Sequence, residues 1–294
     1  MGLPLLRLPH LVITKLVDLT SIKDLTCLSL CSKRARNILI VCRRQNRFKG
    51  KFISATVVSN CTALNVHYCE IEVIQISNLE NYMKIGYSKF ELPFSGLTVA
   101  VVKDDIRELE TVEIGGQHVP FFRGKYTLFT FWEDETIGLR KCLDFARETF
   151  EMPVKLLEFS QKGMWAFDWI NGWEEKIPKM TVRVSGIQDD KLKYVMENCE
   201  SRTLKTRGGF VWSGDPKGYP SESFQFDLHE LKAKSFVACT ARWITLQNIS
   251  TSFLEELEIR QSSMTNRDLN LFLRLWLVGG FPSMIPDDDV KGVK

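Results

Sequence analysis

The earliest pattern along the chain is helical, because apolar residues recur at spacings of three and four. A first helix is expected over residues 8–20, with Pro9 in its first turn. Its shared apolar face consists of Leu8, Val12, Leu16 and Leu19. After a break at residues 21–24, a second pattern has a shared face that consists of Leu25, Leu28, Cys31 and Ala35. A helical module this small is not expected to be very stable alone, so its apolar surface indicates a partner.

The next part of the chain alternates in the manner of strands. Segments rich in β-branched residues predict strands at 52–59, 63–68 and 70–77. Residues 110–122 hold Gly115 and Gly116 between two further strand-like runs, which is typical of a tight hairpin. We therefore expect a β-rich region after the helical module.

The remainder of the chain repeats a strand–helix order. A first unit is expected to have a helix at 134–150, with strands at 125–132 and 154–160. A second is expected to have a helix at 189–199, with strands at 180–186 and 202–206. Recurring units of this kind predict right-handed crossovers onto a largely parallel sheet.

A third unit is expected to have a strand at 254–261 and a helix at 265–280. Thr265 is placed as the helix N-cap and Gly279 as its C-cap. Its apolar stripe consists of Leu269, Phe272, Leu273, Trp276 and Leu277. The spacing of Leu254, Leu257 and Ile259 resembles a leucine-rich-repeat strand, but the units recur irregularly, so this likeness is weak.

The predicted fold class is α+β: a small N-terminal helical module, a β-rich segment and an α/β body of strand–helix units. The expected divisions are 1–48, 49–126 and 127–285, with a disordered tail at 286–294.

Charge is distributed unevenly over the chain. Residues 1–50 hold ten basic and two acidic residues, a net charge of +8, and the remaining residues hold 29 basic and 34 acidic ones, a net charge of −5. The basic segment 33–51 leaves nucleic-acid binding open as an alternative function. Apolar residues 38–42 alternate with these charges and indicate a buried side, and Phe48 is the one aromatic residue among them.

Motifs of catalysis or metal binding are not found in the sequence. The four histidines are not clustered, no phosphate-binding or nucleophile motif occurs, and adjacent acidic pairs point to different faces. The eight cysteines form no Cys-x-x-Cys pair and are expected to be reduced thiols in an intracellular protein. We expect no catalytic residue, metal or cofactor. No run of apolar residues is long enough to span a membrane, and no secretory signal is recognised at the N-terminus.

Two groups of aromatic residues are candidates for binding a partner. Trp165, Phe167 and Trp169 alternate, which predicts one face of a buried strand. Trp212 and Tyr219 lie in the glycine-rich segment 207–220, which is expected to be a surface loop. We assign these two residues to substrate binding.

The N-terminal sequence resembles an F-box. Leu8-Pro9, Leu16-Val17, Asp24-Leu25, Leu28 and the run 29–34, "SLCSKR", match the pattern of that family. Two positions depart from it, since Ile22 stands where the family usually has proline and Thr20 where it usually has an aliphatic residue. The resemblance assigns the F-box to residues 1–48.

The similarity continues beyond the F-box. Residues 126–154 resemble the middle segment of the large nematode-type F-box family, and residues 254–285 resemble its C-terminal F-box-associated domain, type 2. The resemblance assigns this domain to about 190–285, within a substrate-recognition region expected at 127–285. The residues that carry the second likeness are Thr265, Asn266, Asp268, Leu269, Asn270, Phe272, Leu273 and Trp276.

The resemblance implies a non-catalytic adaptor of a ubiquitin ligase. The F-box would dock on the Skp linker protein, which joins it to a cullin–RING ligase, and the C-terminal body would hold a protein substrate. The implied docking positions are Leu8, Pro9, Val12, Leu16, Leu25, Leu28 and Cys31, some of which would face the core of the module instead. Such a protein is expected in the cytoplasm or the nucleus, without membrane or nucleic acid as partners.

Overall fold

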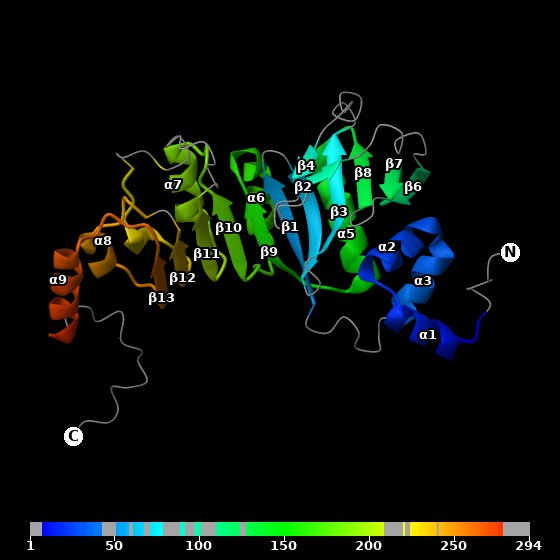
Figure 1. Ribbon diagram of the computed structural model, residues 1–294, viewed down its shortest axis with the longest axis horizontal. Coiled ribbons are helices and arrows are strands. Elements are labelled where there is room, and N and C mark those ends of the chain that lie inside the picture. The colour runs from blue at the N-terminus through cyan, green and yellow to red at the C-terminus, as the bar shows by residue number, and fades with distance from the viewer. Residues whose placement is uncertain are drawn as a thin grey trace, which may run out of the picture. The chain divides into compact units, whose positions relative to one another are not determined.

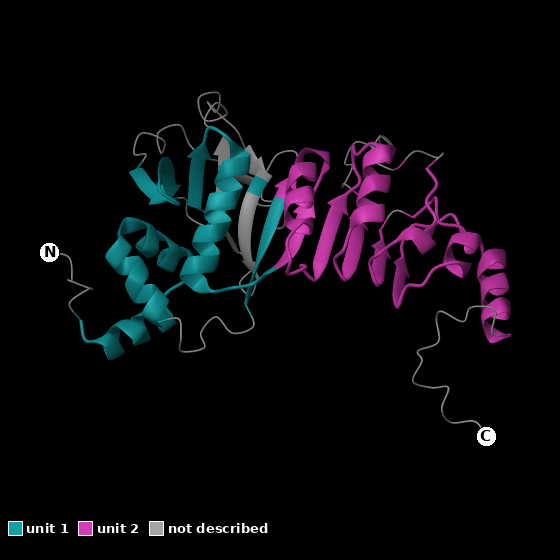
Figure 2. Ribbon diagram, turned by 180° about the vertical axis from the view of Figure 1, so that it is seen from behind, with its two compact units in different colours: residues 1–56, 60–154 teal, residues 57–59, 155–294 magenta. Residues whose placement is uncertain are grey.

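The computed structural model describes residues 8–42, 51–58, 61–67, 71–78, 89–91, 98–100, 110–123, 128–208, 220, 224–239 and 241–278. The chain divides into two compact units (Figure 2). The first unit comprises residues 1–56 and 60–154, and the second comprises 57–59 and 155–294. The mixed content of helices and strands confirms the α+β class.

The first unit begins with three short helices, where two were expected. They are α1 (His10–Leu19), α2 (Ile22–Cys31) and α3 (Lys33–Cys42). Ser32 is extended between α2 and α3, and its hydroxyl accepts a hydrogen bond from the Ala35 amide at 3.0 Å. Serine is a favoured N-cap. The prediction that Ala35 continues the face of Leu25 and Leu28 was therefore wrong, because this serine ends one helix and begins another.

The sheet of the first unit is mixed. Its strands lie in the order β1 (Phe52–Val58), β2 (Cys61–His67), β3 (Ile71–Asn78), β8 (Leu128–Trp132), β7 (Gln117–Arg123) and β6 (Glu110–Ile114). Strands β3 and β8 are parallel, whereas β2–β3, β6–β7 and β7–β8 are antiparallel. Gly115 and Gly116 both have positive φ, so they form the predicted turn between β6 and β7. Strands β4 (Lys89–Glu91) and β5 (Thr98–Ala100) form a separate antiparallel pair.

Helix α5 (Glu135–Phe150) covers this sheet, as Figure 1 shows. Its N-cap Asp134 accepts a hydrogen bond from the Thr136 amide at 2.7 Å. Gly138 allows a close approach, since a Cβ there would lie 2.6 Å from the Trp132 ring on β8. Burial raises the pKa of the Cys142 thiol, which also faces β8, to about 12.

The second unit is a parallel sheet with helical connections, as predicted. Its strands lie in the order β9 (Val154–Phe159), β10 (Lys179–Arg183), β11 (Thr203–Arg207), β12 (Ser235–Ala238) and β13 (Glu256–Ile259). Every neighbouring pair is parallel. The connecting helices are η4 (Gln161–Gly163), α6 (Met164–Asn171), α7 (Asp189–Asn198), η5 (Leu228–Glu230) and α8 (Leu246–Ser250), and α9 (Asn266–Leu277) follows β13.

The prediction of a strand around Trp165 and Trp169 was wrong, because these residues lie on α6. Phe167 and Ile170 of this helix are fully buried, whereas the two tryptophans are half-buried. The rings of Phe167 and Phe159 stack at 5.3 Å, which packs α6 onto β9. The three aromatic residues alternate as on a strand, but Trp165 and Trp169 are also four residues apart, as on one face of a helix. The helix forms here because Phe167 and Ile170, three residues apart, are buried together.

Candidate functional site

Helix α1 has two apolar faces on opposite sides. One is buried and consists of Ile13, Thr14 and Val17. The other consists of Val12, Leu16 and Leu19, and we call it the outer face of α1. Leu8, which the sequence assigned to the same face, precedes the helix. On it Val12 is 42%, Leu16 37% and Leu19 85% exposed. With about 100° between successive residues, the two faces are separated by nearly half a turn.

The buried face holds α1 against α3. The Thr14 hydroxyl donates to the His10 carbonyl at 3.0 Å, and it contacts the Cys42 thiol of α3 at 3.8 Å. At the start of the helix, the Pro9 carbonyl accepts a hydrogen bond from the Ile13 amide at 3.1 Å. These contacts orient the outer face away from the core of the module.

The seven residues that the resemblance assigns to Skp binding differ in exposure. Pro9, Val12, Leu16 and Cys31 are exposed, and Leu8 and Leu28 are half-buried. Leu25 is 1% exposed and belongs to the core of the module. The structure thus makes most of these residues accessible. Leu11 is also highly exposed, and it lies between the two faces of α1, so neither face predicts it.

Polar contacts connect the three-helix module to the sheet of the same unit. Asp24 of α2 accepts a hydrogen bond from Arg123 of β7 at 2.6 Å. A hydrogen bond from the Ser21 hydroxyl holds the pKa of Asp24 below its usual value, and Arg123 contributes further. The module therefore contacts the sheet of its own unit through an exposed ion pair.

Two cations of α3 contact other elements of the first unit. Lys33 lies 3.3 Å from the Glu113 carboxylate of β6, and the Arg36 guanidinium lies 5.5 Å from the centre of the Phe145 ring. Residues 43–50 of the basic segment lie outside the described residues. Nucleic-acid binding by segment 33–51 stays a prediction, although part of its charge serves packing within the protein.

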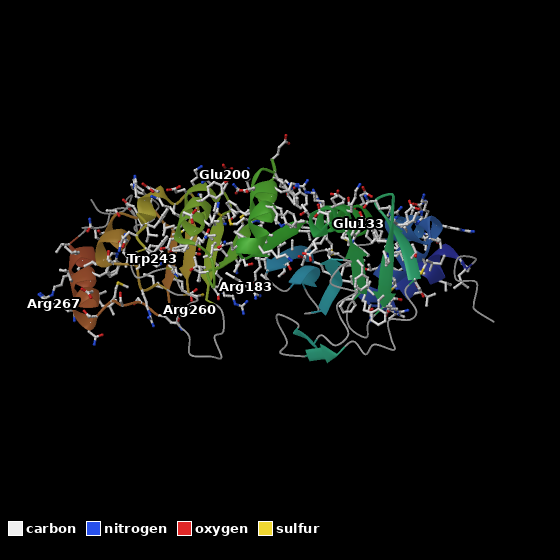
Figure 3. All side chains as sticks on the ribbon, turned by 90° about the horizontal axis from the view of Figure 1, so that it is seen from above. Glu133, Arg183, Glu200, Trp243, Arg260 and Arg267 are labelled. Atoms are coloured by element: carbon white, nitrogen blue, oxygen red, sulfur yellow. The ribbon has the colours of Figure 1, made fainter. Side chains whose placement is uncertain are left out.

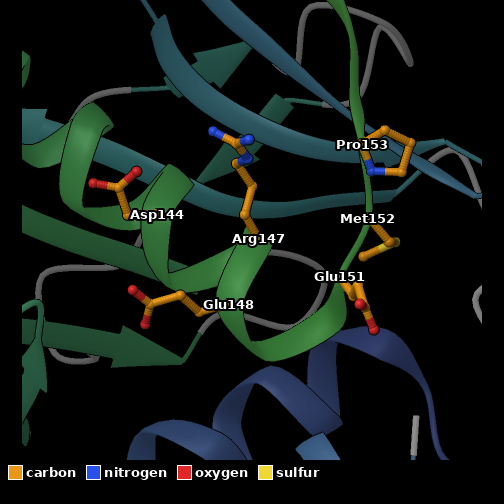
Figure 4. A pocket seen from close by; sticks show the side chains of 6 residues that line it. All are labelled: Asp144, Arg147, Glu148, Glu151, Met152 and Pro153. Atoms are coloured by element: carbon orange, nitrogen blue, oxygen red, sulfur yellow. The ribbon is translucent and has the colours of Figure 1, made fainter. Parts of the chain in front are cut away.

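Elsewhere the first unit has a surface hollow of about 460 Å³ at the end of α5 (Figure 4). Its lining residues are Asp144, Arg147, Glu148, Glu151, Met152 and Pro153. Glu151 has a left-handed backbone, and its amide donates to the Arg147 carbonyl at 2.8 Å, so it ends the helix. The hollow holds no nucleophile beside a base.

The described part of the chain contains neither a candidate metal site nor a candidate membrane span. No three His, Cys, Asp or Glu residues there are grouped closely enough to bind a metal ion. Within the same residues, no helix has the length and apolar character needed to cross a membrane. The proposed substrate-binding residues Trp212 and Tyr219, and the proposed C-cap Gly279, lie outside the described residues.

The C-terminal part of the chain matches a known family. Residues 221–285 match the family model described as F-box associated. The match, which covers 65 of the 294 residues, supports the expected F-box-associated domain. No curated protein matches the chain, and no solved structure matches it.

Proposed function

We propose that the protein is a substrate-recognition adaptor of a Skp–cullin–F-box ubiquitin ligase. Residues 1–48 would be an F-box that docks on the Skp linker, and the C-terminal body would hold the substrate. The observation that carries the proposal is the exposed outer face of α1, on the same chain as the F-box-associated match at 221–285.

The energetics of the outer face support a docking role. Burying a leucine side chain that was exposed stabilises a complex by roughly 1.5–3 kcal/mol. Leu19, which is 85% exposed, offers most of such a gain, and Val12 and Leu16, at 42% and 37%, offer less. One partner surface can cover all three because they share a helical face.

The mechanism would be proximity. The adaptor forms and breaks no covalent bond itself, and it raises the effective concentration of substrate lysines near the ubiquitin carrier. The adaptor would accordingly need no metal and no cofactor.

Co-purification of the full chain with a Skp linker protein tests the proposal. The double variant Val12→Asp/Leu16→Asp should abolish co-purification, because it places two carboxylates in an apolar interface. Ile137→Asp is the matched control, since Ile137 of α5 is also 42% exposed but lies outside the outer face. Absence of binding by the wild type, or equal binding by the double variant, would contradict the proposal.

Thiol labelling gives an independent test without substitution. Cys31 is exposed and should react with iodoacetamide in the free chain, whereas the buried Cys142 should not. Bound Skp linker should protect Cys31. Unchanged labelling of Cys31 in a stable complex would remove that residue from the docking surface.

A further inference from the structure

The parallel sheet of the second unit has two different faces. One face is apolar and packs against helices, as shown by Phe159 of β9 beneath α6 and by the 3.7 Å contact of Met180 Sδ on β10 with Cys199 Sγ after α7. Since side chains alternate along a strand, the residues between these point to the other face. On β9, β10 and β11 those residues include Glu158, Lys179, Thr181, Arg183, Thr203, Lys205 and Arg207.

Two arginines stand side by side on this second face. Arg183 and Arg207 are paired in the register of β10 and β11, and a single carboxylate, that of Glu158 on β9, lies between them. Arg183 Nε donates to Glu158 Oε1 at 2.6 Å, and Arg207 Nη1 lies 3.6 Å from the same oxygen. Two guanidinium groups at this spacing repel each other, and the Glu158 carboxylate offsets that repulsion.

The carboxylate is buried while the arginines are accessible. The side chain of Glu158 is 4% exposed, that of Arg183 25% and that of Arg207 35%. Arg183 uses only its Nε in contacts with described residues, so both Nη atoms remain as donors. Glu158 therefore positions a guanidinium that still has hydrogen bonds to offer.

Two lysines extend the positive charge along the same strands. Lys179 and Lys205 form no ion pair with any other described residue. We call Lys179, Arg183, Lys205 and Arg207 the basic zone. With Glu158 included, these residues carry four positive charges and one negative charge, a net +3.

The basic zone is bounded by acidic residues at the edge of the sheet. Glu256 and Glu258 lie on β13, and Arg260 binds Glu258 with its Nε at 2.6 Å. Figure 3 shows Arg183 and Arg260 on one side of the second unit and Glu200 on the other. Among the described residues, Lys179 on β10 and Lys205 on β11 thus form no ion pair, and Arg183 beside them keeps both Nη atoms as donors.

We propose that the basic zone binds an extended acidic peptide of the substrate. This rests on the proposed function, because an adaptor must hold a protein. Arginine recognises carboxylates through paired hydrogen bonds, and an extended peptide presents every second side chain at intervals of about 6.6–6.8 Å on one face. Between the cations in the strand register lie the short side chains of Thr181, which is buried, and Thr203, which is half-buried. None of the outward residues of β10 and β11 is aromatic, so the zone lacks the stacking surface that single-stranded nucleic acid uses.

Fluorescence anisotropy with the full chain and fluorescein-labelled decaglutamate tests the proposal. We expect saturable binding at about 50 mM salt that weakens at about 200 mM, and no binding of decaglutamine. Lys179→Gln/Lys205→Gln should weaken binding at least about threefold, and Arg183→Gln/Arg207→Gln at least about tenfold. The second variant leaves Glu158 unpaired, so its folding must be verified, whereas the lysine variant removes no ion pair.

The matched control is Lys191→Gln/Lys193→Gln on α7, which removes the same charge from the helical side and should change affinity less than twofold. Equal binding by the lysine variant and the wild type would overturn the proposal. So would tighter binding of oligothymidine than of decaglutamate, or a gain in affinity after deletion of residues 287–294, whose three aspartates would then be the occupant.

Skp co-purification distinguishes this proposal from the proposed function. The basic-zone variants should retain the Skp linker, and Val12→Asp/Leu16→Asp should retain decaglutamate. Loss of both activities in one variant would indicate misfolding, which circular dichroism would reveal, and the lysine variant would then decide.

Discussion

Helix α5 buries eight of its residues, whereas α9 buries none. Both helices are amphipathic, and both begin with a side-chain cap, Asp134 in one and Thr265 in the other. On α9 the stripe predicted from the sequence is present, but Leu269, Leu273 and Trp276 are each close to half exposed. Two helices with similar amphipathic patterns thus differ in burial, because the apolar face of α5 is buried and that of α9 is exposed.

The difference lies in what stands beside each helix. Helix α5 covers the middle of its sheet, where Gly138 meets Trp132 of β8 and Ile76 of β3. Helix α9 follows β13, the last strand in the order of its sheet, so the described chain provides no further strand for it to cover. A hydrophobic stripe indicates which face of a helix can be buried. Whether that face is buried depends on the neighbouring elements.

The largest expected effect is in the core beneath α5. Leu143 is fully buried, so Leu143→Ala should lower the free energy of unfolding by about 2–5 kcal/mol through lost burial and a cavity. Urea unfolding followed by circular dichroism measures it. A loss below about 1 kcal/mol would mean that α5 is not packed as described.

A smaller effect is expected at the closest approach of α5 to the sheet. Alanine usually stabilises a helix over glycine by about 0.5–1 kcal/mol. At Gly138 the added Cβ would lie 2.8 Å from Ile76 Cγ2 and closer still to Trp132, so Gly138→Ala should instead destabilise by about 1–3 kcal/mol. Gly172→Ala is the control, since its nearest contact would be 3.3 Å. A stabilised Gly138→Ala variant would refute the close packing.

The start of α9 should respond to pH. Hydrogen bonds from the Thr265 side chain and backbone hold the pKa of Asp268 below its usual value. The cap therefore contributes stability above about pH 3.9, the ordinary pKa of aspartate, and loses it as the pH falls through the lower pKa of the folded protein. NMR shifts of the Thr265 and Asp268 amides measure this.

A natural control for that titration is present in α8. Its capping box joins Thr245 to Asn248, which does not titrate. Asp268→Asn should therefore keep the cap and remove its pH dependence. Parallel acid shifts at both helices would show that general unfolding, and not Asp268, is responsible.

The smallest effect is expected on the stripe of α9. Leu273 is 50% exposed, so Leu273→Ala should change the free energy of unfolding by less than about 0.5 kcal/mol. The same truncation in α5 is expected to cost several times more. A loss above about 2 kcal/mol would show that Leu273 is buried in solution.

Much of the fold could be predicted because local signals agreed with the tertiary arrangement. The glycine pair at 115–116, the Thr265 cap and the strand–helix order each specify backbone geometry within a few residues. The failures have one cause. Ser32 divides a continuous apolar pattern, and the aromatic run around Phe167 fits two periods, so packing chose between local alternatives.

The candidate docking residues could be predicted only in part. The sequence indicated that Leu16 and Leu25 were both apolar helical positions, but it did not show that one is exposed and the other belongs to the core. That distinction depends on tertiary packing, in which Thr14 on the buried face of α1 contacts Cys42 of α3 while Leu25 of α2 lies in the core of the module.

By itself the sequence determined many of the helices and strands and the parallel arrangement of the second unit, because periodicity and caps act over short distances along the chain. It did not determine which apolar faces stay exposed, or that Arg183, Arg207 and Glu158 meet. Arg183 and Arg207 lie 25 and 49 positions along the chain from Glu158, and only the register of β9, β10 and β11 brings the three residues together. Contacts between distant strands depend on that register, which the tertiary structure alone fixes.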